Sequence, residues 1–185
     1  MRWLLLIVLC LAAPAEAAVR IDFYSRDTDT RFPHAYVSLT GTLDTTGAAV
    51  EADYGFTPYS ISPLALIGPI RGHVVSAGRE YVSQGGVRFS MVLTDDEYAR
   101  VMAVVSEWQS RAQPSYDLET GNCVTFVADI AEALGLRITD DPRLVRRPTT
   151  FLNRVATINA HLLEARLERA LSEGAGTPTL GEAQR

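Results

Sequence analysis

Cys123, one of two cysteines, and three histidines are the residues of this chain that could carry nucleophilic catalysis. Cys123 stands at the expected start of a helix, directly after Asn122, a residue type that caps helix N-termini. The unpaired amides and the dipole of a helix start favour a thiolate, which is the reactive form of cysteine. A cysteine nucleophile also needs a base, and histidine is the usual one. The composition therefore allows a thiol hydrolase, provided that a histidine folds against Cys123.

The three histidines have different surroundings. His34 follows Pro33 and opens an expected strand, so its imidazole could point toward a cleft. His73 opens another short strand, whereas His161 lies within a helix beside an apolar stripe and is expected to be half-exposed, without a role. Taken alone, each histidine is better explained as a surface residue or a satisfied core residue. The positions of the three histidines in the sequence do not by themselves identify which one is the base.

Cys123 also has a purely structural explanation. It shares a helix face with apolar residues at offsets of 3, 4, 7 and 11, namely Phe126, Val127, Ile130 and Leu134. A single cysteine on such a face is often a small buried hydrophobic residue. The chemical and the structural explanation both stay open on these residues alone.

The first 17 residues resemble a secretory signal peptide. Arg2 is followed by 11 apolar residues, Trp3 to Ala13, and Ala15-Glu16-Ala17 offers the small-x-small pattern of a cleavage site. The run is too short to span a bilayer, which takes about 20 residues. We expect a mature protein that starts near Ala18 and is periplasmic or secreted. Cleavage would remove Cys10 and leave Cys123 unpaired, which suits a buried inert thiol, an intermolecular disulfide or a reactive thiol.

Composition excludes several function classes. The 185 residues carry 17 basic and 22 acidic side chains, a net charge of −5, which disfavours a nucleic-acid partner. Every basic residue is arginine, so lysine Schiff-base and Walker-type chemistry is excluded. No cluster of residues has metal-ligand spacing, and we expect no cofactor. Membrane contact is compatible with the sequence but is not implied by it.

The elements that must position these residues follow from periodicity and turn signals. Strands are expected at residues 19–24, 34–40, 48–56, 73–77, 80–83 and 87–93. Thr94 and Glu97 form a capping-box pattern, which predicts a helix that starts after Thr94. A second helix is expected to start near Asn122 or Cys123 and to end at Gly135. Residues 149–172 form one long C-terminal helix after Pro148, and residues 173–185 a disordered tail. Strands followed by helices predict an α+β fold with an antiparallel sheet.

Three segments in this order resemble a circularly permuted papain-like domain, the superfamily of the NlpC-type cell-wall endopeptidases and the lecithin-retinol acyltransferase-like enzymes. They are RFPHAYVSLTG, AAVEADYGF and YDLETGNCVTFVADIAEALGL. The resemblance covers about residues 30–136 and implies a permuted papain-like domain over residues 18–148. It implies Cys123 as the nucleophile and His34 as the base. One departure concerns the substrate: Tyr36 stands where these endopeptidases usually carry a glycine.

The resemblance also implies a third polar residue on the returning strand. The matching position is Glu51, in the setting Val50-Glu51-Ala52, and Asp53 on the same strand face could replace it. A carboxylate there would accept a hydrogen bond from the second imidazole nitrogen and stabilise the imidazolium. A solvent-facing hairpin residue is the equal alternative for Glu51. His73 has no place in the pattern and stays a second candidate base.

These observations predict an exported cysteine hydrolase or amidase, with a cell-wall peptide bond as the simplest substrate. The backbone N–H of Cys123 would form part of the oxyanion hole. An acyltransferase or lipid thioesterase could use the same residues on an acyl substrate of the cell envelope. A non-catalytic envelope protein with the same fold is the third hypothesis. Fast alkylation of Cys123 at pH 6 would support catalysis.

Overall fold

The computed structural model describes residues 18–27, 33–60, 62–76 and 78–172. The expected signal segment 1–17 and the expected tail 173–185 lie outside the described residues.

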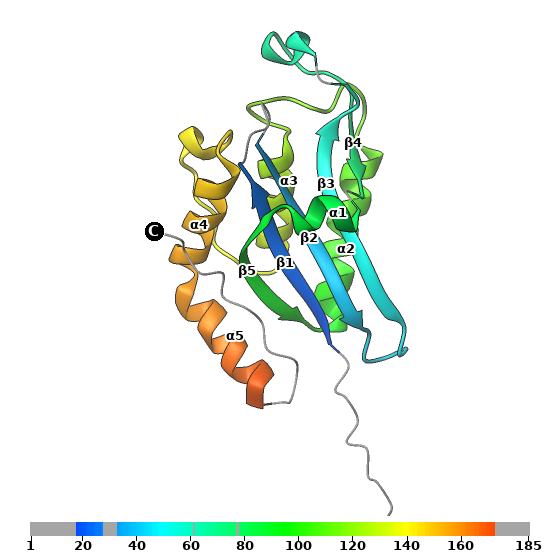
Figure 1. Cartoon of the computed structure of the whole chain (residues 1–185), viewed down its shortest axis with the longest axis vertical. Coiled ribbons are helices and arrows are strands. Elements are labelled where there is room, and N and C mark those ends of the chain that lie inside the picture. The colour runs from blue at the N-terminus through cyan, green and yellow to red at the C-terminus, as the bar shows by residue number, and fades with distance from the viewer. Residues whose placement is uncertain (1–17, 28–32, 61, 77, 173–185) are drawn as a thin grey trace, which may run out of the picture.

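A five-stranded antiparallel sheet forms the centre of the protein (Figure 1). In spatial order its strands are β4 (Gly72–Val75), β3 (Ala49–Pro58), β2 (His34–Thr42), β1 (Val19–Arg26) and β5 (Gly86–Leu93). Alternate residues of the long strands are fully buried on one face, among them Ile21, Phe23, Ala35, Val37, Leu39 and Phe89. This period of two gives the sheet one apolar face, which the helices cover.

Four helices pack on the apolar face: α2 (Asp95–Ser110), α3 (Cys123–Ala133), α4 (Pro148–Ile158) and α5 (Ala160–Ser172). Thr94 and Glu97 form the expected capping box of α2, and Gly135 ends α3 with a φ of 80°. Glu97 is itself buried and accepts a hydrogen bond from Arg166 of α5 at 2.7 Å. The predicted α+β fold with an antiparallel sheet against helices is therefore confirmed, and it is consistent with a permuted papain-like arrangement.

The short helix α1 (Arg79–Ser83) lies on the opposite face of the sheet, in front of it in Figure 1. The predicted strand at residues 80–83 is therefore wrong. Gly78 precedes the segment, its carbonyl accepts from the Val82 N–H at 3.0 Å, and four residues are too few for periodicity to separate a strand from a helical turn.

The expected single helix 149–172 is two helices that meet at Asn159. The Asn159 side chain accepts from the Arg137 N–H at 2.8 Å and donates to the Arg137 carbonyl at 2.8 Å. An asparagine that bonds the backbone of another segment interrupts the regular helix at that point. The expected C-terminal helix is therefore interrupted at Asn159, where this side chain bonds the backbone of Arg137.

Two 3₁₀ turns complete the described elements, at Pro63–Leu66 and Pro142–Leu144. No helix within the described residues is long and apolar enough to cross a membrane.

Candidate active site

Cys123 is the first residue of α3, as the sequence predicts. Asn122 caps the helix: its Oδ1 accepts from the Val124 N–H at 2.7 Å and from the Thr125 N–H at 3.2 Å. Its Nδ2 donates to the carbonyls of Leu118 and Val145 at 2.8 and 3.0 Å. Both polar ends of this buried amide are therefore in use, and together they hold the helix start in place.

The Cys123 sulfur lies against the beginning of β2. The backbone N–H of Ala35, the residue after His34, donates toward it, as do the N–H groups of Cys123 and Val124. Burial nevertheless dominates, because the residue is only 6% exposed. Burial raises the pKa of the Cys123 thiol to about 11, and the N–H donors lower it by less. The amides of the helix start therefore lower the thiol pKa as expected, but burial outweighs them and the net pKa is raised.

His34 is the first residue of β2 and lies beside Arg26 of β1 in the strand register. Its imidazole stacks on Tyr36 at a centroid distance of 5.9 Å and meets Tyr81 of α1 edge-on at 6.2 Å. Its Nε2 lies over the backbone of β3, where a Cβ added to Gly55 would stand 2.8 Å away. Burial among these groups lowers the pKa of His34 to about 4.

These pKa values describe a neutral pair near pH 7. His34 is unprotonated above pH 4 to 5, and Cys123 is a thiol below pH 10. A resting thiolate–imidazolium pair is therefore not the state that this geometry stabilises.

Two tyrosines complete the surroundings of Cys123, and sequence reasoning assigned neither of them to the site. Tyr81 and Tyr116 are both close enough for the Cys123 charge to raise their pKa values, although burial is the larger cause for each. The Arg26 guanidinium lies 4.9 Å above the Tyr81 ring. Tyrosines in short irregular segments carry no spacing signal, so only the folded chain reveals them.

Glu51 does not approach His34. The register of β2 and β3 places Glu51 opposite Thr40, six residues from His34, which corresponds to about 20 Å along a strand. Asp53 lies opposite Ser38, four residues from His34, or about 13 Å. The register therefore places Glu51 well away from His34, whereas the imidazole itself leans toward Gly55, two residues from Asp53 on β3.

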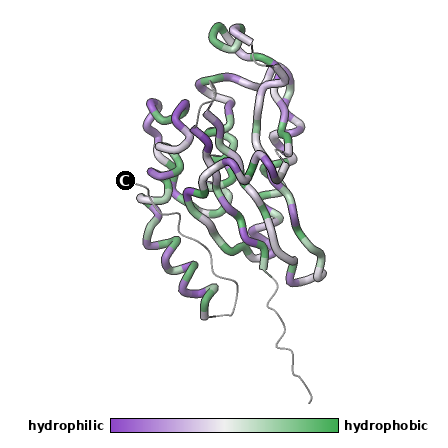
Figure 2. Tube along the Cα trace, viewed as in Figure 1, coloured by the Kyte–Doolittle hydropathy of each residue, from purple (hydrophilic) through white to green (hydrophobic). Residues whose placement is uncertain are grey.

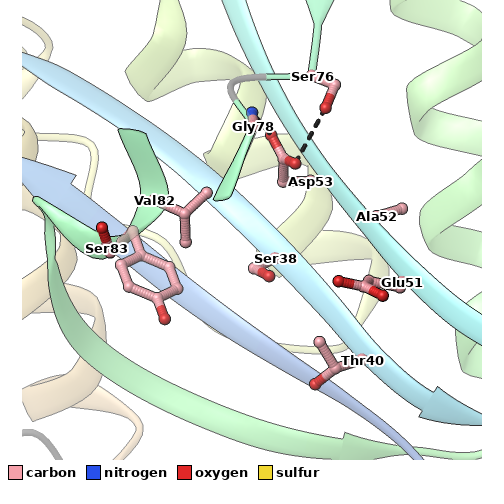
Figure 3. A pocket seen from close by; sticks show the side chains of 10 residues that line it. Ser38, Thr40, Glu51, Ala52, Asp53, Ser76, Gly78, Val82 and Ser83 are labelled. Atoms are coloured by element: carbon pink, nitrogen blue, oxygen red, sulfur yellow. Dashed lines mark hydrogen bonds between the residues drawn. The ribbon is translucent and has the colours of Figure 1, made fainter. Parts of the chain in front are cut away.

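Glu51 and Asp53 instead line a separate polar cavity of about 540 Å³ on the outer face of the sheet (Figure 3). Hydroxyl residues of β2, Ser38 and Thr40, lie beside them. Asp53 accepts from the Ser76 hydroxyl at 3.0 Å and from the Gly78 N–H at 3.2 Å. The two carboxylates thus line this cavity, and Asp53 is bonded to the segment before α1.

The β3 residue over which the His34 imidazole lies is Gly55, whose Cβ position would also stand 3.2 Å from the Tyr36 Cβ. The regular pairing of β2 with β3 runs from Thr42 with Ala49 to Val37 with Tyr54. Farther along β3, Thr57 pairs with His73 of β4. The close approach of His34 to Gly55 was not expected, because it depends on the hairpin register.

The two remaining histidines have other neighbours. His73 stacks on Tyr59 at 4.0 Å, and its Nδ1 is buried without a hydrogen-bond partner among the described residues. His161 is fully exposed on α5, with Glu164 3.9 Å away, so its expected half-exposed position is wrong. Within the described ranges, no three His, Cys, Asp or Glu residues are grouped so that they could hold a metal ion.

No protein-family model matches the sequence, and no curated protein matches it either. Among solved structures, the chain is similar to the crystal structure of a Type VI secretion system effector, TseH. The similarity has a TM-score of 0.48 and 20% sequence identity, and it covers 77% of this chain and 89% of that chain. The function is therefore argued below from the residues of the chain itself.

Proposed function

We propose that the protein is a cysteine hydrolase of the amidase type, with Cys123 as nucleophile and His34 as general base. The observation that carries the proposal is the capped start of α3, which holds the Cys123 sulfur against the residue that follows His34. Nucleophile and base come from elements almost ninety residues apart. The resemblance to permuted papain-like enzymes supports the same two residues.

The reaction begins with two neutral groups. The Cys123 sulfur attacks the substrate carbonyl carbon while its proton passes to the imidazole of His34. The Cys123 N–H faces the sulfur and is placed to donate to the oxyanion, whereas Asn122 engages the next two N–H groups. The C–N bond then breaks, the amine takes the proton from His34, and water hydrolyses the thioester with His34 as base.

The base is oriented by packing rather than by a carboxylate. Tyr36 and Tyr81 enclose the imidazole on two sides, and the Gly55 backbone lies beneath Nε2. Substrate must displace or open this aromatic enclosure before it can reach the sulfur.

The test is product analysis with peptidoglycan fragments and, separately, phospholipids. We expect new amine and carboxyl ends in the cell-wall peptide by mass spectrometry, lost in Cys123→Ala and reduced at least about 100-fold in His34→Ala. The matched control is His161→Ala, which removes an exposed imidazole and should retain full turnover. Equal turnover in His34→Ala and His161→Ala would overturn the assignment of the base.

A lipid ester is the second candidate substrate, because exposed apolar side chains lie on the segment between β3 and β4, near this end of the sheet. Release of fatty acid, or its transfer to an amine, would favour this alternative. A thiol that acts on neither substrate and stays inert to alkylation would favour a non-catalytic envelope protein. Export, and thus access to either substrate, rests on the expected signal segment 1–17.

A further inference from the structure

The segment between β3 and β4 projects beyond the end of the sheet, at the top of Figure 1. Four large apolar side chains are exposed there: Tyr59 by 58%, Leu64 by 62%, Leu66 by 75% and Ile67 by 83%. We call these four residues the apolar tip. Among the described residues, the other exposed large hydrophobic side chains are Leu162 and Leu171 of α5, at 37% and 52%. Exposed apolar surface gathered at one protruding point marks an interaction site.

The tip has a defined backbone and is not a frayed loop. Ser62 caps the turn Pro63–Leu66 by accepting from the Leu64 N–H at 3.2 Å. The Tyr59 N–H donates to the Arg71 carbonyl at 3.0 Å and closes the base of the projection. The backbone of the turn is therefore held in place, and Figure 2 colours parts of this projection as hydrophobic.

Charge separates this projection from the rest of the acidic chain. The sequence from Tyr54 to Arg79 contains no Asp or Glu, although the whole chain has a net charge of −5. Arg71 stands at the base of the tip, with its guanidinium 5.1 Å above the Tyr59 ring. An aromatic ring and an arginine below protruding aliphatic side chains suit the interface of a bilayer, where the arginine meets anionic headgroups.

We propose that the apolar tip inserts into the surface of an anionic lipid bilayer. A protein partner is the weaker alternative, because a stable interface takes about 20 to 30 residues a side, more than this convex turn offers. A deformable bilayer needs no complementary groove and accepts single protruding side chains.

Docking of the tip would bring the cysteine end of the sheet toward the bilayer. Ile70, at the base of the projection, forms a two-hydrogen-bond bridge with Tyr116 at 2.8 and 2.9 Å. Tyr116 is one of the two tyrosines beside Cys123. Binding by the tip does not depend on the activity of Cys123, so the two proposals can fail independently.

The first experiment compares two tryptophan variants of the full-length chain, Ile67→Trp and Leu171→Trp. Both are mixed with vesicles of equal parts phosphatidylglycerol and phosphatidylcholine, some carrying brominated acyl chains. We expect a blue shift and bromine quenching for Ile67→Trp beyond those of Leu171→Trp. Both proteins carry the same residues 1–17, and Trp108 is buried in both, so a difference reports the tip. Equal responses would overturn the proposal.

The second experiment measures vesicle binding by sedimentation. Leu66→Ser with Ile67→Ser should weaken binding at least about tenfold, whereas Leu162→Ser with Leu171→Ser should not. Arg71→Gln should weaken binding about fivefold on the anionic vesicles and leave binding to pure phosphatidylcholine unchanged. If the tip variant instead abolishes a concentration-dependent oligomer and leaves vesicle binding unchanged, the tip is a protein interface and the proposal is wrong.

Discussion

The outer face of strands β2 and β3 holds two regions that differ in their access to water. At one end, His34 is enclosed by Tyr36, Tyr81 and the backbone of Gly55. Toward the other end, Glu51 and Asp53 line an open polar cavity. Both regions lie on the same two strands, and both contain ionisable groups that the sequence grouped into one site.

The difference teaches that enclosure, more than residue type, decides what these groups can do. Burial makes the neutral form of His34 the stable one, and it does the same for the thiol of Cys123. The Asp53 carboxylate is instead held by a hydroxyl and an amide at the edge of α1. A neutral imidazole can accept a proton near pH 7, whereas a solvated carboxylate far from the sulfur cannot assist it.

The largest effect is expected from filling the space under the imidazole. Gly55→Ala adds a Cβ 2.8 Å from the His34 Nε2 and 3.2 Å from the Tyr36 Cβ, so the imidazole must move. We expect hydrolysis to fall about 100-fold, since a displaced general base loses its contribution. Gly68→Ala is the control, because nothing lies within 4 Å of its Cβ position. Full turnover in Gly55→Ala would show that this position of His34 is not the working one.

A smaller effect is expected from opening the enclosure. Tyr81→Ala admits water to His34 and Cys123, so their pKa values should move back toward 6.5 and 9. Alkylation of Cys123 by iodoacetamide at pH 7 should accelerate about tenfold for each unit by which its pKa falls. Mass spectrometry of the tryptic peptide of residues 112–137 measures the rate. Tyr59→Ala, which removes a ring stacked on His73, should leave that rate unchanged.

Acid stability provides a third comparison. The pKa of His34 is lowered from 6.5 to about 4, so its neutral form stabilises the fold fully above pH 6.5, and this stability is lost as pH falls through 4. We expect His34→Gln to remove about 3 kcal/mol of the loss in unfolding free energy between pH 7 and pH 4. Urea titrations at the two pH values measure it. His161→Gln should behave as the wild type, and an identical loss in both variants would contradict the enclosure of His34.

The smallest effect is expected at the open end. Glu51→Gln changes an exposed side chain and should alter the unfolding free energy by no more than about 0.5 kcal/mol. It should leave both hydrolysis and Cys123 alkylation at the wild-type level. A loss of turnover comparable with that of Gly55→Ala would restore Glu51 to the site and invalidate the distinction between the two regions.

Much of the architecture could be predicted from local signals. Alternation identified the five strands, and the caps at Thr94 and Asn122 placed the starts of α2 and α3. The prediction of a strand at residues 80–83 was wrong because a helical turn and a short strand have similar sequence patterns at that length. The break between the two helices at Asn159 was not predicted, because it depends on hydrogen bonds to the backbone of Arg137, which only the tertiary fold brings near.

The third site residue could not be predicted because it depends on register. The turn after β2 closes with the Leu43 N–H on the Ala48 carbonyl at 3.0 Å, which aligns Thr40 with Glu51. Two long strands then extend from this turn, so Glu51 stays opposite Thr40, six residues from His34 along β2. Residue types alone do not encode this pairing.

The bonds of Asn122 have a consequence for how the chain can be divided. Its Nδ2 donates a hydrogen bond to the carbonyl of Val145, which links the start of α3 to the segment that leads into α4. The last two helices are bonded to earlier parts of the chain in the same way. Asn159 accepts a hydrogen bond from the Arg137 N–H, and Arg166 donates one to Glu97. The C-terminal helices are thus part of the scaffold of Cys123 and no detachable appendage. Two fragments, separated between Asp140 and Asp141 and produced together, should complement each other and restore the buried thiol, whereas either fragment alone should not.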